Sequence, residues 1–179
     1  MSNILIVDSN EDQLASMESV FDTKEHSVTS MNRTEGILHV VLGTKPDIII
    51  LDLSSKRAER KEGPVLYKQL RDNDITKSTP IIFLSSTPEI YNCCSFSLNK
   101  SIDAVLAKPY DKNDLHKLVK KQINNSLIYK SLDNVSLSIE RLKVCQCAGT
   151  CSPHLQNVEM AKKALDKFEE LKKKFNQDL

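Results

Sequence analysis

Four short apolar runs recur along the first 110 residues, and each is followed by a polar residue. The runs are residues 3–7 before Asp8, 48–51 before Asp52, 80–84 before Ser85 and 104–107 before Lys108. Unbroken apolar runs of this length are typical of strands that are buried on both faces of a sheet. We therefore predict four buried strands, with a weaker strand at about residues 27–31.

Amphipathic stretches lie between these runs and predict helices. They cover residues 11–23, 35–43, 64–72 and 111–122, with an irregular region at about 90–99. Pro64 suits the first turn of its helix, and Asp111 suits an N-cap with Asp114 three positions later. Because strands and helices alternate along the chain, the pattern predicts an α/β fold with a doubly wound, five-stranded parallel sheet.

The polar residues after the strands predict one shared site. Ligands of doubly wound sheets bind outside the carboxyl ends of the strands, where Asp8, Asp52, Ser85 and Lys108 are expected to converge. Such a set suits phosphoryl transfer. Asp52 would be the nucleophile, Asp8 would help to hold a divalent cation, Ser85 would hydrogen-bond a phosphoryl oxygen and Lys108 would neutralise its charge.

Four motifs together resemble the receiver domain of two-component response regulators. They are "ILIVDSNEDQL", "PDIIILDLSS", "PIIFLSS" and "AVLAKPYD", and they occur in the family's order within about residues 1–122. The resemblance implies a flavodoxin-like fold and a proline of the cis type at Pro109. It also implies that Asp52 is the phosphoacceptor, Lys108 the phosphate-sensing lysine and Ser85 the switch hydroxyl. Magnesium would be held by Asp8, Asp52 and the carbonyl of Ser54.

The chain departs from the family pattern in three places. Ser9 stands where the family usually has a second acidic residue, which predicts weak magnesium binding because a hydroxyl is a poor ligand for a hard cation. Glu11 and Asp12 are further acids nearby, on the predicted helix that follows. Val105 replaces the usual switch aromatic.

The loop after Asp52 is long and basic. It is either a solvated surface or a contact for a partner or the phosphate. Its cations are Lys56, Arg57, Arg60 and Lys61.

A different pattern begins at about Gln122. An apolar seam at coiled-coil spacing runs through Ile128, Leu132, Val135, Ile139 and Leu142. A second Lys/Glu-rich helix is predicted from the apolar positions Val158, Ala161, Leu165, Phe168 and Phe175. Residues 123–179 are therefore predicted to form a helical hairpin or short coiled coil, with a cysteine-rich loop at about 145–154. The seam packs either within its own hairpin or against a second chain, and we favour a homodimer.

The cysteine-rich loop contains a candidate zinc site. Its motif C-x-C-x3-C-x2-H supplies Cys145, Cys147, Cys151 and His154, which match tetrahedral zinc in number and type. Reduced thiols without a metal and a redox or iron–sulfur site are the alternatives. The remaining cysteines are interpreted as buried small residues and the remaining histidines as surface or packing residues; these are Cys93, Cys94, His26, His39 and His116.

Composition and charge narrow the partners and the compartment. Lys and Arg number 25 against 24 for Asp and Glu, so the net charge of +1 gives no reason to expect nucleic acid or an anionic membrane as a partner. No apolar run reaches the length of a membrane span, and the first residues lack the features of a signal peptide. A cytoplasmic protein is expected.

Two functions remain open on this evidence. The first is a response regulator that is phosphorylated on Asp52 by a histidine kinase or phosphotransfer protein and signals through protein contacts of its C-terminal helices. The second is a pseudo-receiver adaptor that takes no phosphate and whose cysteine module binds metal or senses redox state. We expect no enzymatic activity on a separate substrate.

Overall fold

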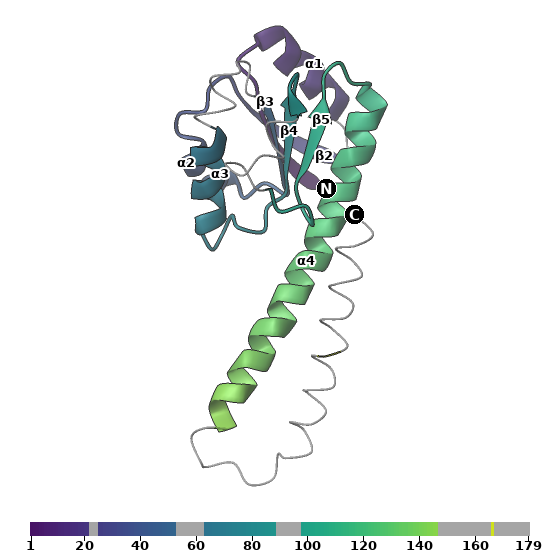
Figure 1. Ribbon diagram of the computed structural model, residues 1–179. Coiled ribbons are helices and arrows are strands. Elements are labelled where there is room, and N and C mark those ends of the chain that lie inside the picture. Colours follow the sequence, from purple (N-terminus) through teal and green to yellow (C-terminus); the bar gives the residue numbers. More distant parts are fainter. Residues whose placement is uncertain (22–24, 53–62, 89–97, 147–165, 167–179) are drawn as a thin grey trace. The chain divides into compact units, whose positions relative to one another are not determined.

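The computed structural model describes residues 1–21, 25–52, 63–88 and 98–146, together with residue 166. The described strands form one parallel sheet of five in the order β2-β1-β3-β4-β5 (Figure 1). They are β1 (Ser2–Val7), β2 (His26–Met31), β3 (Ile48–Asp52), β4 (Ile81–Ser85) and β5 (Ala104–Ala107). The predicted strands and the doubly wound, flavodoxin-like architecture are confirmed.

The chain runs from β1 outward to β2 and then crosses to the other side of β1 to form β3. This reversal places the topological switch point between β1 and β3, where Val7 is in register with Leu51. The central strands are buried along their length; all residues of β3 and β4 are buried. The apolar runs of the sequence thus correspond to strands that are covered on both faces.

Helices cover the two faces of the sheet. They are α1 (Glu11–Phe21), α2 (Ile37–Thr44), α3 (Gly63–Asp72) and α4 (Lys112–Gln146). One core cluster joins α2 and α3 to Leu5 and Val7 of β1, and the other joins α1 and α4 to Ile4 and Ile6. Alternate β1 side chains therefore enter opposite cores, as the two-residue period of a strand requires.

Two predicted helix starts are confirmed. Pro64 is the second residue of α3, and an Oδ1 atom of Asp111 accepts a hydrogen bond of 2.7 Å from the backbone N–H of Asn113 at the start of α4. That bond satisfies one of the N–H groups that the first turn of a helix leaves without a partner.

The structure differs from the prediction at the end of α4. The prediction separated a helix of residues 111–122 from the helical segment that follows, whereas α4 continues without interruption to Gln146. No glycine or proline occurs between Lys112 and Gln146. The helix therefore contains no helix-breaking residue at the point where its apolar positions move to a different face.

The chain divides within α4 into two compact units, Met1–Ser126 and Leu127–Leu179. In the second unit Ile128 and Val135, two members of the predicted seam, are 45% and 43% exposed. The side chains of the other seam members, the second predicted helix and the cysteine-rich loop lie outside the described residues, so the coiled coil stays a prediction. Within the described ranges no helix is both long and apolar enough to cross a bilayer.

A buried polar network stabilises the amino ends of β4 and β5. Asp103, just before β5, pairs with the guanidinium of Arg71 on α3 and accepts hydrogen bonds from the Tyr67 hydroxyl at 2.8 Å and the Ile81 N–H at 2.9 Å. Arg71 also donates to the carbonyl of Thr79 at 2.9 Å. This network connects α3 to the amino ends of β4 and β5, whereas the predicted site lies at the carboxyl ends of the strands.

Candidate functional site

The four predicted site residues lie at the carboxyl edge of the sheet. Asp8 follows β1, Asp52 ends β3, Ser85 ends β4 and Lys108 follows β5. Asp8, Asp52 and Ser85 are 1%, 5% and 1% exposed, so three polar side chains are buried next to one another at the switch point. The backbone N–H of Lys108 donates to the carbonyl of Ser85 at 2.8 Å, which extends the β4–β5 pairing to the lysine.

Lys108 and Asp52 form an ion pair. The Asp52 side chain is 3% exposed and the Lys108 side chain 26%, so the ammonium covers the carboxylate from the solvent side. Lys108 Nζ also donates to the Oε1 atom of Gln13 on α1 at 3.4 Å. The Lys108–Pro109 peptide bond is cis, as the resemblance implied.

The pKa of Asp52 is raised to about 6. Burial is the largest cause and the negative charge of Asp8 adds to it, while the hydrogen bond and charge of Lys108 oppose both. At neutral pH and above, Asp52 is therefore a carboxylate that water solvates poorly and that one lysine neutralises in part. This is the state that a nucleophilic carboxylate requires.

Of the two carboxylate oxygens of Asp8, one accepts a hydrogen bond and the other does not, among the residues that the structure describes. Its Oδ1 atom accepts a hydrogen bond of 2.8 Å from the N–H of Asn10, whereas its buried Oδ2 atom has no hydrogen-bond partner among the described residues. A buried carboxylate oxygen without a partner is costly unless a cation or donor satisfies it. Two adjacent buried carboxylates, one with an unsatisfied oxygen, fit a hard divalent cation.

Ser85 ends β4, and Val105 lies on β5, the neighbouring strand at one edge of the sheet. The Ser85 Oγ atom accepts a hydrogen bond of 2.9 Å from the Thr87 N–H, which orients the hydroxyl at the end of β4. Val105 is in register with Phe83 and packs against the core cluster on the α2/α3 side. A partly buried valine thus occupies the position where the family commonly has an aromatic ring.

Several predicted residues lie outside the part of the chain that the structure describes. Ser54 and the basic loop with Lys56, Arg57, Arg60 and Lys61 lie outside the described residues, as do Cys147, Cys151 and His154. Cys145 is on α4, but its side chain is outside the described part. In the ranges that the structure describes, no three His, Cys, Asp or Glu side chains form a metal-binding group.

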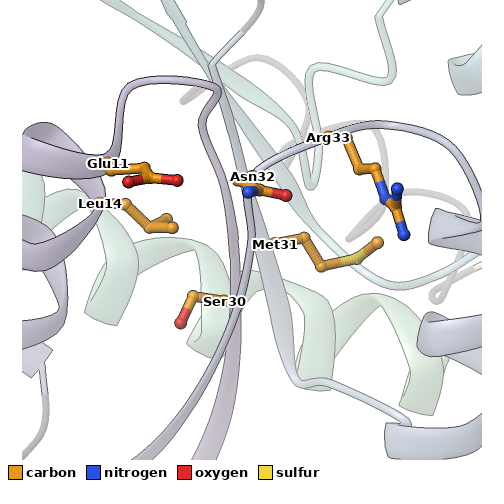
Figure 2. Close-up of a pocket in the computed structure, with 6 residues that line it drawn as sticks. All are labelled: Glu11, Leu14, Ser30, Met31, Asn32 and Arg33. Carbon is orange, nitrogen blue, oxygen red and sulfur yellow. The ribbon is translucent and has the colours of Figure 1, made fainter.

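Sequence reasoning did not find a cleft beside the acidic site. It has a volume of about 430 Å³ and lies between the start of α1 and the end of β2 (Figure 2). Its lining residues are Glu11, Leu14, Ser30, Met31, Asn32 and Arg33. The Asp8 N–H donates to the Met31 carbonyl at 3.1 Å, so the cleft and the acidic site share a wall. Glu11 lines this cleft, and its carboxylate points toward Asn32 in Figure 2.

Comparison with known families identifies the family of the chain. The family model of the response regulator receiver domain matches residues 4–120. The chain belongs to this family, and the resemblance predicted from the four motifs is confirmed. In a comparison with curated proteins, no sequence matches the chain.

Solved structures support the same fold. A sensor protein from Polaromonas sp. JS666 superposes with a TM-score of 0.58 at 19% identity, over 70% of this chain and 98% of the other. A response regulator from Desulfuromonas acetoxidans gives 0.55 at 22%, over 69% and 98%. The receiver domain of a sensor histidine kinase from Pseudomonas aeruginosa PAO1, with a magnesium ion coordinated in its active site cleft, gives 0.56 at 19%, over 69% and 98%. At these identities the likeness shows the fold alone.

Proposed function

We propose that this chain is a response regulator of a two-component system and that Asp52 is its phosphoacceptor. The observation that carries the proposal is the buried Asp52 carboxylate at the switch point, paired with Lys108 and adjacent to Asp8. The phosphoryl donor would be a phosphohistidine on a histidine kinase or phosphotransfer protein. The receiver family supports this donor class.

The proposed reaction transfers one phosphoryl group to a carboxylate oxygen. An Oδ atom of Asp52 attacks phosphorus, a P–O bond forms and the P–N bond of the phosphohistidine breaks. The leaving imidazole keeps the electron pair of that bond and takes up a proton. Lys108 lies beside the attacked position and neutralises charge on the phosphoryl oxygens, and the Ser85 hydroxyl is the nearby donor to one of them.

Magnesium is the proposed cofactor, held by Asp8 and Asp52. The buried Oδ2 atom of Asp8 is the feature of this chain that fits it. The ion would supply positive charge for the phosphoryl oxygens. Because Ser9 replaces a charged ligand, we propose that magnesium binds more weakly than it would with an acid at this position.

The output is proposed to be a protein contact made by the segment after Ser126. Leu127, Ile128, Val135 and Leu137 each expose between 43% and 56% of their surface on α4. Exposed apolar side chains on a helix are typical of surfaces that pair with another helix. Of these, Ile128 and Val135 are seven residues apart and share one face of the helix. We propose a homodimer or a protein partner at that face.

The test is the intact mass of the full chain after incubation with magnesium and acetyl phosphate. The account predicts a gain of one phosphoryl group, which Asp52→Asn abolishes and which Asp74→Asn preserves. Asp74 is the matched control because its side chain is 94% exposed and lies outside the site. Absence of a gain at saturating magnesium would contradict the proposal and favour the pseudo-receiver adaptor.

A further inference from the structure

His26 is a buried histidine whose ring nitrogens form no hydrogen bond with the residues that the structure describes. It is the first residue of β2 and is 7% exposed, and neither ring nitrogen has a hydrogen-bond partner among the described residues. Buried polar groups in proteins are almost always hydrogen-bonded. Because the His26 ring is buried without a hydrogen bond to a described residue, this position favours the neutral imidazole over the charged one.

Three aromatic rings from three elements meet at this position. The His26 ring lies 6.3 Å from that of Phe21 at the end of α1 and 6.1 Å from that of His116 on α4, both in edge-on arrangements. Phe21 and His116 stack at 5.9 Å with planes 19° apart. We call Phe21, His26 and His116 the histidine joint. It connects the edge strand β2 to the helices that cover one face of the sheet.

The charges around the joint are mostly positive. Lys120 lies one turn after His116 on α4, and the N-terminal ammonium of Met1 also faces His26. Among the described residues, Glu25 is the acid that faces it from the turn before β2, but its side chain is 71% exposed and already 3.7 Å from Lys120. A positive charge on the His26 ring would therefore meet these cations and one solvated acid. Burial, followed by the charge of His116, lowers the pKa of His26.

We propose that the histidine joint is a proton-sensitive latch between β2, α1 and α4. With the His26 imidazole neutral, the three rings pack together and hold the first part of α4 against the receiver domain. Protonation of His26 places a charge in the joint and weakens this packing. Since α4 continues past Ser126 as the same helix, the latch controls the helix that carries the second unit. The latch is independent of the phosphorylation of Asp52.

Hydrogen exchange of the full chain tests the latch directly. At about pH 5.5, compared with about pH 7.5 and corrected for the intrinsic rate, amides of β2 and of residues 112–126 are expected to lose several-fold protection. Amides of β3 and β4 are expected to lose none, because protonation of Asp52 over the same pH interval favours the folded state. His26→Phe, which retains an aromatic ring without a titrating group, should abolish the loss in β2 and in residues 112–126. His39→Phe is the matched control, because His39 is exposed on α2.

A second measurement does not depend on any variant. In an NMR titration of the wild-type chain, the His26 ring and the amides of β2 and of residues 112–126 should change with one shared midpoint below the ordinary value for histidine. The latch is contradicted if those amides move at a different pH from the ring. It is also contradicted if His26→Phe folds and keeps the full pH difference in exchange.

Discussion

Asp52 combines two properties that conflict in a folded protein, since its side chain is buried and its proposed role as phosphoacceptor requires a charged carboxylate. The Lys108 ammonium neutralises only part of that charge, because Asp8 is a second buried carboxylate beside it. The folded pKa of about 6 lies above the ordinary value of 3.8. A group whose pKa is raised by folding favours the folded state while it is protonated, and this advantage is lost as the pH rises through the folded pKa.

The substitution Asp52→Asn is therefore expected to stabilise the chain at pH 8. The difference between 6 and 3.8 corresponds to about 2–3 kcal/mol in the free energy of unfolding. The gain should shrink as the pH falls from 6 and vanish below about pH 4, where Asp52 is protonated in both states. Urea unfolding at pH 8 and pH 4.5 measures it, with Asp74→Asn as the exposed control. A loss of stability at pH 8 would show that Lys108 outweighs burial and Asp8.

At the scale of elements, two ion pairs formed by residues of α3 have different environments. Arg71 and Asp103 join α3 to β5, with side chains 14% and 0% exposed, while Lys68 and Asp72 pair on the surface of α3 with 76% and 62% exposed. Water screens the charges of the exposed pair, so that pair contributes little to stability. Water does not reach the buried pair, so each of its charges depends on the other. The buried pair should therefore hold β5 in place, and Lys108 directly follows β5.

We expect Asp103→Ala to destabilise the chain by about 3 kcal/mol, because it removes the buried carboxylate that pairs with Arg71 and accepts hydrogen bonds from the Tyr67 hydroxyl and the Ile81 N–H. Asp72→Ala, the matched control on the exposed pair, should change stability by less than about 0.5 kcal/mol. Chemical denaturation of both variants at neutral pH provides the comparison. Equal effects of the two substitutions would refute the structural role assigned to the network.

At the scale of the whole molecule, the continuous helix α4 links the receiver domain to a segment with exposed apolar residues. If Ile128 and Val135 pair with a second copy, sedimentation of the wild-type chain should show a dimer, and the double substitution Ile128→Glu/Val135→Glu should give a monomer. Val65→Glu is the control, because Val65 is 58% exposed on α3 outside the seam. A wild-type monomer at all concentrations would exclude the homodimer and leave a different protein partner.

The sequence predicted the sheet because its signals are local. A run such as residues 48–51 is buried on both faces and reads as a strand by itself, and the topology rule for parallel sheets then brings Asp8, Asp52, Ser85 and Lys108 to one edge. The missed features are pairings between distant segments. Asp103 meets Arg71 across 32 residues, and His26 meets His116 from the other end of the domain, with no spacing that marks either pair.

The length of α4 was missed for a different reason. The apolar face that packs on the sheet ends at about Ile123, and another apolar face begins at Ile128, which suggested two helices. A helix persists through such a change unless a breaker occurs, and none does before Gln146. A change in the apolar face of a helix therefore does not by itself mark the end of that helix.

The most direct test of the central claim is to locate the phosphoryl group by peptide mass spectrometry after reaction with acetyl phosphate and magnesium. The account predicts that the group is on the peptide that contains Asp52, that it requires magnesium, and that Ser9→Asp lowers the magnesium concentration needed. A phosphoryl group on any other peptide, or none at saturating magnesium, would contradict the assignment of Asp52 as the phosphoacceptor.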